Sequence, residues 1–379
     1  MTEIGILTHS FVDAYNGRTH KMYGGGLERY LYDLAVTIME MGHKPTIHQL
    51  SFCGSFRTEV EGIEVIGYPC SPAGETVDTF NFMTSQAQGR LIYASFIWQP
   101  IDYRPGSIGI CHGINWDYPP TPFEAKKDIA ATIQRALQRL SRVISVDSHF
   151  LSFCRSVCSF TDPEQIVLLP NAVDTDRFAP VHFWHKPSTE AVHVLYPRRI
   201  SIERGIVPMM LIADRLLDTY PQVKVHFAGE GVDDSLITKV FKLWLQDHPH
   251  LDRIDHQAYS FGQMPQAYRQ ANIAVIPTLF SEGTSYSCLE ALSCGLAVVS
   301  SNVGGLNDLI IDGYNGILVP PAEDRLYQAI AGLVENGGTR HYLGANARAT
   351  ARAFDRRIWK NKWRRILSDY LGAAATATE

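Results

Sequence analysis

Residues 281–295 read SEGTSYSCLEALSCG, and this stretch carries the strongest pattern in the chain. An apolar, strand-like run at residues 273–277 comes directly before it, and helix-forming residues follow until Gly295 ends them. Glu282 therefore falls on a strand-to-helix loop, and Glu290 falls inside the helix. Their separation is a little over two helical turns, so we expect both carboxylates on the same side.

The loop between the two carboxylates also offers backbone donors. Gly283, Thr284 and Ser285 present N–H groups at the start of the predicted helix. A helix start carries partial positive charge and attracts phosphate. The stretch thus combines acceptors for hydroxyl groups with a donor cluster for an anion. A nucleotide-sugar needs both, because it has hydroxyls at its two ends and a diphosphate between them.

Length and composition describe an ordinary globular protein. The chain has 379 residues, which favours two domains. A net charge of −5 argues against nucleic acid as a partner. Seven scattered cysteines favour reduced thiols in a cytosolic protein. The N-terminus reads as a strand rather than a signal peptide, and no apolar run approaches the roughly 20 residues that span a bilayer. We therefore expect a cytoplasmic protein.

Strand-like and helical runs alternate along the whole chain, which predicts an α/β protein with parallel sheets. The expected strands lie near residues 3–9, 44–50, 63–67, 107–111, 142–147 and 165–169, and then near 192–197, 223–228, 272–277, 296–300 and 316–319. We divide the chain into domains at 1–178 and 192–354, a linker at 179–191, a terminal helix at 355–371 and a disordered tail at 372–379.

Two loops that follow predicted strands carry features suited to phosphate. Arg199 and Arg204 lie in the stretch YPRRISIERG, residues 196–205, where cations beyond a strand end can face a ligand crevice. Guanidinium forks suit diphosphate oxygens, and a solvated surface cluster is the alternative. Gly24, Gly25 and Gly26 let the backbone approach a ligand closely, with a plain turn as the alternative. A dinucleotide fingerprint is disfavoured, because no Gly-x-Gly-x-x-Gly is complete.

The chain resembles the retaining glycosyltransferases of family 4, the glycosyl transferases group 1. The resemblance implies the GT-B architecture, in which two Rossmann-like domains have parallel sheets that face a central cleft. It is densest between residues 192 and 321, and rests on Glu282-x7-Glu290, Gly304-Gly305-Leu306, Asp312-Gly313, Asn315-Gly316 and Leu318-Val319-Pro320. Residues 169–178 also match a family signature, with Ala172 in place of Gly.

The resemblance implies a donor site in the second domain. Arg199 takes the position of the family's Arg, Arg204 that of its usual Lys, and Arg198 replaces its usual Gly. Arg199, Arg204 and the backbone N–H groups would bind the diphosphate; these N–H groups are those of Gly283, Thr284 and Ser285. Glu290 would bind the ribose, Glu282 would bind the donor sugar, and backbone around Gly262 would hold the base.

In the first domain, the resemblance places the Gly24–Gly26 loop near the donor phosphates and the acceptor. His112 follows a predicted strand, and the resemblance places it near the reacting sugar; a lone His is more often structural. Aromatic side chains in loops of the first half are candidates to line the acceptor pocket, with core packing as an equal alternative; these are Trp98, Tyr103, Trp116 and Tyr118.

The basic terminal helix carries Trp359 and Trp363 one turn apart. It either packs back on the first domain, as in related enzymes, or touches anionic lipid at the inner face of the membrane. We favour the first interpretation. A peripheral membrane contact is the second.

The implied reaction moves a sugar from a UDP- or GDP-linked donor to a hydroxyl of a glycan, a lipid-linked glycan or a metabolite. It retains the anomeric configuration and uses neither a metal nor another cofactor; Asp174-x-Asp176 is not a metal motif on this fold. The rivals are an epimerase or a phosphorylase of the same architecture, and a nucleotide-sugar-binding protein without catalysis. The donor base, the sugar, the acceptor and the oligomeric state stay open.

Overall fold

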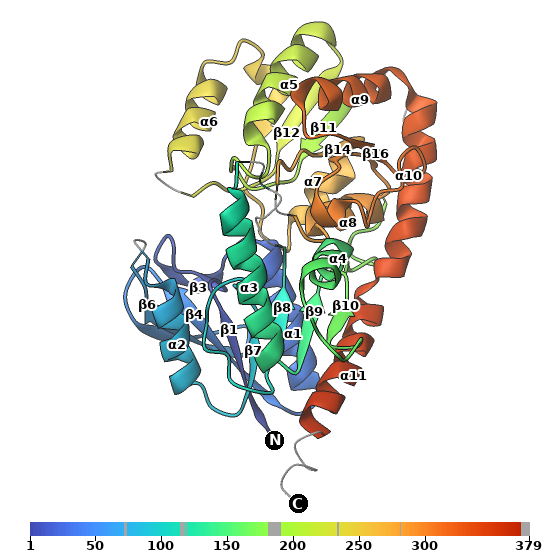
Figure 1. Cartoon of the computed structure of the whole chain (residues 1–379). Coiled ribbons are helices and arrows are strands. Elements are labelled where there is room, and N and C mark those ends of the chain that lie inside the picture. Colours follow the sequence, from blue (N-terminus) through green and yellow to red (C-terminus); the bar gives the residue numbers. More distant parts are fainter. Residues whose placement is uncertain are drawn as a thin grey trace, which may run out of the picture. The chain divides into compact units, whose positions relative to one another are not determined.

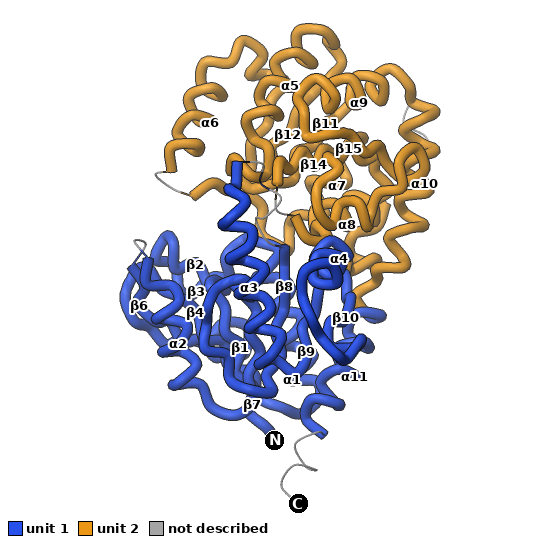
Figure 2. Tube along the Cα trace, viewed as in Figure 1, with its two compact units in different colours: residues 1–170, 357–379 blue, residues 171–356 orange. Residues whose placement is uncertain are grey.

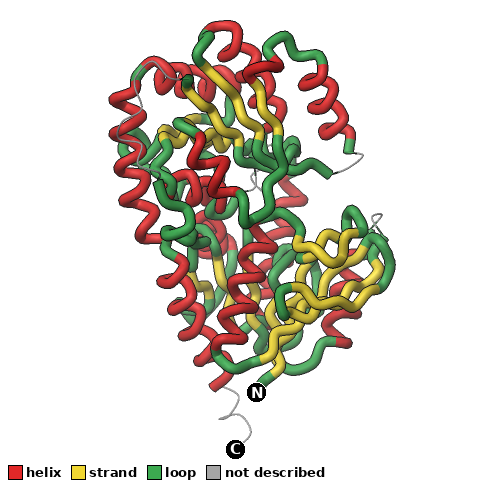
Figure 3. Tube along the Cα trace, turned by 180° about the vertical axis from the view of Figure 1, so that it is seen from behind, coloured by secondary structure: helices red, strands yellow, loops and turns green. Residues whose placement is uncertain are grey.

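The computed structural model describes residues 1–71, 74–113, 118, 120–180, 191–232, 235–280 and 282–372 (Figure 1). The chain divides into two compact units (Figure 2). Unit 1 comprises Met1–Pro170 and Arg357–Glu379, and unit 2 comprises Asn171–Arg356. Seen from behind, each unit shows strands side by side with helices next to them (Figure 3).

Unit 1 contains an eight-stranded sheet in the order β10-β9-β8-β7-β1-β4-β6-β5. Its pairings are parallel except that β5 runs antiparallel to β6. The central strands are almost wholly buried apolar runs, as a parallel sheet covered on both faces requires. The strands are β1 (Glu3–Thr8), β4 (Lys44–Ser51), β5 (Phe56–Val60), β6 (Ile63–Pro69), β7 (Arg90–Tyr93), β8 (Ile108–Cys111), β9 (Arg142–Ser145) and β10 (Ile166–Leu168).

The helices of unit 1 bury apolar side chains, several of them in one cluster with strands of this sheet. They are α1 (Gly26–Glu40), α2 (Thr76–Gln86), α3 (Phe123–Arg139), α4 (Ser148–Val157) and, from Arg357 onward, α11 (Arg356–Gly372). A short antiparallel hairpin, β2 (Val12–Asp13) and β3 (Arg18–Met22), precedes α1.

Unit 2 contains a six-stranded parallel sheet in the order β13-β12-β11-β14-β15-β16. Its strands are β11 (Val192–Tyr196), β12 (Val223–Phe227), β13 (Ile254–His256), β14 (Ile273–Ile276), β15 (Ala297–Ser301) and β16 (Ile317–Val319). Its helices are α5 (Ile206–Thr219), α6 (Leu236–Gln246), α7 (Met264–Gln270), α8 (Tyr286–Ser293), α9 (Glu323–Glu335) and α10 (Gly337–Ala351). The prediction of parallel sheets is thus confirmed in both units.

Each sheet reverses its direction of growth at one point. In unit 2 the chain moves from β11 to β12 and β13, and then returns to place β14 on the other side of β11. In unit 1 it moves from β1 to β4 and β6, and then places β7 on the other side of β1. Open α/β sheets bind ligands at such switch points, beyond the carboxyl ends of the strands. We therefore expect ligand sites on the loops that follow β11 and β14 in unit 2, and β1 and β7 in unit 1.

Some elements differ from the expectations. The strand β7 was not predicted although it lies beside β1 and is as long as β8 and β9, which were predicted. The strands β5 and β13 and the hairpin were also not predicted. Helix α8 begins at Tyr286 rather than near Thr284, because Ser285 is its N-cap and accepts from the Cys288 N–H at 3.4 Å.

The first domain ends earlier than expected. We predicted an end at residue 178, but Asn171–Phe178 belong to unit 2. The N–H of Val173 donates to the Phe354 carbonyl at 2.9 Å, and Phe178 is completely buried in an apolar cluster of unit 2. Asp174 accepts from the backbone N–H of Arg177 at 3.0 Å and pairs with Arg356 at 2.7 Å. Residues 181–190 of the expected linker and residues 373–379 of the expected tail lie outside the described residues.

Helix α11 makes its aromatic contacts inside unit 1. Trp363 donates to the hydroxyl of Tyr30 at 3.0 Å, and Lys360 pairs with Glu40 at 2.6 Å. Trp359 and Trp363 are 3% and 0% exposed, so these two rings are not available to a lipid surface. Among the helices that the structure describes, none is both long and apolar enough to cross a membrane.

Candidate functional site

The carboxylate of Glu282 lies at the switch point of unit 2, in the loop that follows β14. Its Oε2 atom accepts hydrogen bonds from Arg198, from Arg204 Nη1 at 2.7 Å and from the Thr278 hydroxyl at 2.8 Å. Both arginines stand on the loop that follows β11, the neighbouring strand. The adjacency of the two strands thus brings together residues that are 84 and 78 positions apart in the sequence.

The cations decide the charge of this carboxylate. Burial by itself would raise the pKa of Glu282, but the Arg198 and Arg204 guanidinium groups outweigh it and hold that pKa below its ordinary value. Glu282 is therefore an anion at neutral pH. Two guanidinium groups around one carboxylate leave an excess of positive charge, and Arg199 on the same loop adds to it. This excess suits a diphosphate.

The loop that bears the arginines, residues 197–205, is held in place by Tyr196 and by Gly205. The hydroxyl of Tyr196, which is completely buried, donates to the carbonyls of Arg199 at 3.0 Å and Arg204 at 3.1 Å. Gly205 has a left-handed φ of 78° as it caps α5, and a Cβ there would lie 1.9 Å from the Pro277 carbonyl oxygen. Only glycine permits this close approach without displacing the loop.

The loop that bears Glu282 is supported by the Gly304-Gly305 pair. The N–H of Gly305 donates to the Glu282 carbonyl at 2.9 Å. A Cβ on Gly304 would lie 2.1 Å from that carbonyl oxygen, and one on Gly305 would lie 2.5 Å from the Thr284 nitrogen. The glycine pair therefore acts as packing for the predicted phosphate loop. Asn171 holds the same loop, because its backbone N–H donates to the Thr284 hydroxyl at 2.8 Å.

The second glutamate has different surroundings. Glu290 lies within α8, is 4% exposed and accepts from the Tyr268 hydroxyl at 2.8 Å. The two carboxylates of the motif are thus held by different groups, Glu282 by arginines and Glu290 by a tyrosine. Gly262 is exposed between β13 and α7, and Arg177 donates to the neighbouring Phe261 carbonyl at 2.9 Å.

In unit 1 the glycine loop leads directly into α1, which begins at Gly26 after the N-cap Gly25. A Cβ on Gly25 would lie 2.1 Å from a carboxylate oxygen of Glu28. The Glu28 side chain, 2% exposed, therefore folds over the loop in the first turn of the helix. An acidic group at this place is favourable to the helix dipole.

His112 follows β8, and its ring meets the ring of Tyr30 edge-on with centroids 4.6 Å apart. Its Nε2 atom is buried and has no hydrogen-bond partner among the described residues. Burial, followed by the neighbouring charge of His9, lowers the pKa of His112 to about 3. The ring is therefore neutral at physiological pH and offers a hydrogen bond rather than a positive charge.

Sequence reasoning missed the switch point of unit 1. His9 follows β1 and Ser95 follows β7, and His9 Nδ1 lies 2.9 Å from the Ser95 hydroxyl. The His9 ring stacks on Phe96 with centroids 5.0 Å apart. Phe96 has a φ of +61°, which is rare for a bulky residue and is often found at functional sites. Because β7 was not predicted, nothing in the sequence marked its carboxyl end.

The sequence family model described as "Glycosyl transferases group 1" matches residues 182–350, which include both glutamates and all three arginines of this site. Residues 182–350 are thus similar in sequence to the group 1 glycosyltransferases. One curated relative is a phosphatidylinositol N-acetylglucosaminyltransferase subunit from Arabidopsis thaliana, 23% identical over 81% of this chain and 70% of that protein. A glycogen synthase of Mycobacterium tuberculosis is 27% identical over 56% of this chain and 47% of that protein.

Solved structures of the same fold cover nearly the whole chain. A sucrose-phosphate synthase from Thermosynechococcus elongatus has a TM-score of 0.77 at 18% identity, covering 98% of this chain and all of that one. The Anabaena protein HepE, solved in complex with UDP-glucose, has a TM-score of 0.71 at 16% identity, covering 97% of this chain and all of that one. The chain spans about half the length of the glycogen synthase.

The predicted aromatic acceptor residues do not form one group. Tyr103 is 3% exposed in the core of unit 1, and its hydroxyl donates to the Phe96 carbonyl at 3.0 Å, so core packing explains it. Trp98 is partly buried and meets Phe96 edge-on at 5.6 Å, near the switch point. Tyr118 is 39% exposed. Trp116 lies outside the described residues.

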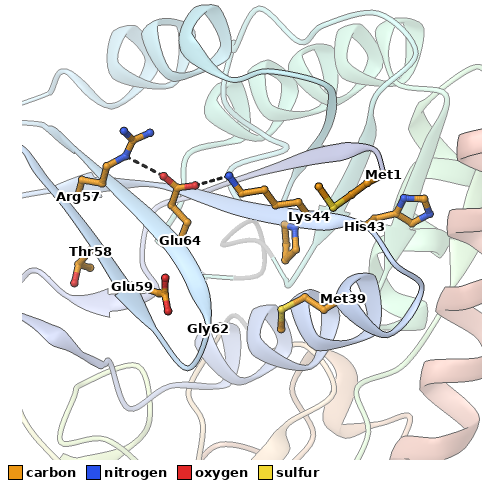
Figure 4. A pocket seen from close by; sticks show the side chains of 10 residues that line it. Met1, Met39, His43, Lys44, Arg57, Thr58, Glu59, Gly62 and Glu64 are labelled. Atoms are coloured by element: carbon orange, nitrogen blue, oxygen red, sulfur yellow. Dashed lines mark ion pairs between the residues drawn. The ribbon is translucent and has the colours of Figure 1, made fainter.

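A hollow of about 640 Å³ lies elsewhere in unit 1 (Figure 4). It is lined by Lys44, Arg57 and Glu64, and Glu64 pairs with each of the two cations at 2.9 Å. Lys44 is the first residue of β4, so this hollow is at the amino end of that strand. Ligands of such sheets bind at the carboxyl ends, and none of the predicted site residues lines the hollow.

Proposed function

We propose that this protein is a group 1 glycosyltransferase that moves a sugar, with retention of configuration and without a metal, from a UDP- or GDP-linked donor to a hydroxyl of a glycan, a lipid-linked glycan or a metabolite. The observation that carries the proposal is the cluster of Arg198, Arg204 and Glu282 at the switch point of unit 2. It combines cations for a diphosphate with an anionic acceptor for hydroxyls, next to the start of α8.

The donor is assigned to unit 2 in this proposal. Arg199, Arg204 and the N–H groups of residues 283–285 hold the diphosphate. Glu282 accepts from a hydroxyl of the sugar, and Glu290 accepts from the ribose. The complex of HepE with UDP-glucose supports a nucleotide-sugar as the donor class, since that protein shares the fold.

The proposed reaction balances without a nucleophile from the protein. The bond between the anomeric carbon and the diphosphate oxygen breaks, and its electron pair stays on the diphosphate. The acceptor oxygen bonds to the same carbon on the same face, and its proton passes to the leaving phosphate oxygen. The arginines stabilise the charge that develops there, and losing one such contact costs on the order of a hundredfold in kcat.

The acceptor is assigned to the switch point of unit 1. The His9–Phe96 stack and the edge of Trp98 offer aromatic surface, which suits a sugar ring. Ser95 and the neutral ring of His112 offer hydrogen bonds to hydroxyls. Turnover with an acceptor separates this transferase from an epimerase, which needs none, and from a binding protein without catalysis.

Calorimetry with UDP, GDP, ADP and their glucose conjugates, with and without magnesium, tests the donor site. We expect one nucleoside diphosphate to bind without magnesium, to lose affinity in Glu290→Ala and to keep it in Asp252→Ala, an exposed acid of the same unit. Incubation of the binding nucleotide-sugar with oligosaccharide acceptors then tests transfer, and NMR of the product tests retention. A folded protein that binds none of the nucleotides overturns the proposal.

A further inference from the structure

The third arginine of the site, Arg198, stands where the resembling family usually has glycine. We propose that Arg198 is a positioning residue for donor-sugar recognition: it holds the Oε2 atom of Glu282, so that the Oε1 atom of the same carboxylate accepts from a sugar hydroxyl. The inference rests on the proposed function and names the residue that orients its sugar-binding carboxylate.

Arg198, on the loop after β11, contacts three residues of the connection between β14 and α8. Its Nη1 donates to the Ser285 hydroxyl, the N-cap of α8, at 2.7 Å. Its Nη2 donates to Glu282 Oε2 and lies 3.4 Å from the Thr278 hydroxyl. A planar guanidinium can bridge two such partners in a fixed geometry, whereas a glycine or a lysine cannot.

The two arginines that pair with Glu282 differ in exposure. The side chain of Arg198 is 7% exposed and that of Arg204 is 25% exposed. Arg204 can therefore turn toward an incoming diphosphate, because one side of it already meets solvent. Arg198 stays with the carboxylate when Arg204 turns away, so Glu282 is never left buried without a cation. An unpaired buried carboxylate is strongly unfavourable, and its protonation would remove an acceptor.

The oxygen atoms of Glu282 are used unequally. Among the described residues, all three donors to its side chain, from Arg198, Arg204 and Thr278, bind Oε2. This saturates one oxygen and directs a new donor, such as a sugar hydroxyl, to the other. The Nε atom of Arg198 is buried without a partner within the described ranges. The hydrogen bonds to Glu282 and Ser285 thus set the position of the guanidinium, although its buried Nε–H then makes no hydrogen bond.

The test compares two ligands by calorimetry, the nucleoside diphosphate and its sugar conjugate, in wild type, Arg198→Gly and Arg198→Lys. We expect Arg198→Gly to change the Kd of the nucleoside diphosphate by no more than about threefold. The Kd of the sugar conjugate should rise by about tenfold more than the Kd of the nucleoside diphosphate, because a tenfold change corresponds to the loss of about one hydrogen bond. The ratio of the two Kd values in Arg198→Lys should lie between the ratios in wild type and in Arg198→Gly. Arg325→Ala, an exposed arginine of the same unit, should change neither ligand.

A double variant tests whether Arg198 acts through Glu282. In Glu282→Gln, the further change Arg198→Gly should no longer lower the affinity for the sugar conjugate relative to the nucleoside diphosphate. Equal weakening of both ligands in Arg198→Gly would overturn the inference, since Arg198 would then act on the phosphates or on the loop as a whole. If Arg198→Gly does not fold, an unchanged ligand ratio in Arg198→Lys overturns it. Absence of all nucleotide binding in wild type instead refutes the proposed function.

Discussion

Gly305 donates its backbone N–H to the carbonyl oxygen of Glu282 at 2.9 Å, so the turn after β15 directly supports the loop that bears the donor-side carboxylate. The glycine pair of the sequence motif thereby acquires a physical role. Neither glycine binds the substrate in our proposal. Both are small because the backbone of residues 282–284 occupies the space where their side chains would be.

Substitution Gly305→Ala should therefore displace the Glu282 loop. Its Cβ would lie 2.5 Å from the Thr284 nitrogen, which is backbone and cannot rotate away. We expect a loss of about 1–3 kcal/mol in the free energy of unfolding, as for other overpacked sites, together with weaker nucleoside diphosphate binding. Denaturant titration and calorimetry measure both. Gly332→Ala, in α9 with nothing within 4 Å of the added Cβ, should be neutral or stabilising.

The hydrogen bond from Tyr268 to Glu290 gives a second prediction. Tyr268→Phe removes the hydroxyl that donates to a buried carboxylate at 2.8 Å. We expect a loss of about 1–3 kcal/mol in unfolding free energy, and weaker binding of the nucleoside diphosphate because Glu290 loses an orienting partner. Tyr314→Phe, at a residue that is 43% exposed, is the matched control and should change neither quantity. Unchanged stability in Tyr268→Phe would contradict the assignment.

The two tryptophans of α11 should differ in their sensitivity to replacement by Phe. Trp363→Phe removes the bond to the Tyr30 hydroxyl, whereas the Nε1 atom of Trp359 is buried without a partner in the part of the chain that the structure describes. The loss of ring volume is the same in both. We expect Trp363→Phe to destabilise by about 1 kcal/mol more than Trp359→Phe in thermal or chemical unfolding. Equal effects of the two changes would show that the Trp363–Tyr30 bond contributes nothing.

The buried ring of His112 predicts a pH dependence of stability. Its pKa is lowered from 6.5 to about 3, so between these values the unfolded chain binds a proton that the folded protein does not. Stability therefore falls as the pH falls below about 6.5. His112→Gln removes this contribution, and we expect its unfolding free energy to change less than that of wild type between pH 7 and pH 5. Parallel curves for the two proteins would show that His112 is not held neutral.

The switch point of unit 1 predicts an effect on the acceptor. Ser95→Ala removes the hydroxyl that lies 2.9 Å from His9 Nδ1 and 3.1 Å from the Thr8 hydroxyl. We expect the KM for the acceptor to rise by about tenfold while the affinity for the nucleoside diphosphate stays constant, because the proposed donor residues are in unit 2. Ser85→Ala, at an exposed serine of α2, serves as the control. A change in donor affinity alone would argue against an acceptor role.

The alternating α/β pattern, most of the strands and the charged loops of unit 2 could be predicted from the sequence. These features depend on short-range periodicity and on residue types at the ends of strands, which are visible within about ten residues. The motif from Glu282 to Glu290 and the arginines at residues 198, 199 and 204 are of this kind. The failures were equally local. Strand β7 was not recognised, and with it the positions of Ser95 and Phe96 were lost.

Which of these groups contact one another depends on how the strands are arranged in three dimensions. The pairing of Arg198 with Glu282 requires that β11 and β14 lie side by side, although two strands and three α-helices separate them in the chain. The same folding buried Tyr103 and the tryptophans of α11 in unit 1, and it assigned residues 171–178 to unit 2. Strand order and burial arise from contacts between distant segments, so a sequence pattern read locally does not contain them.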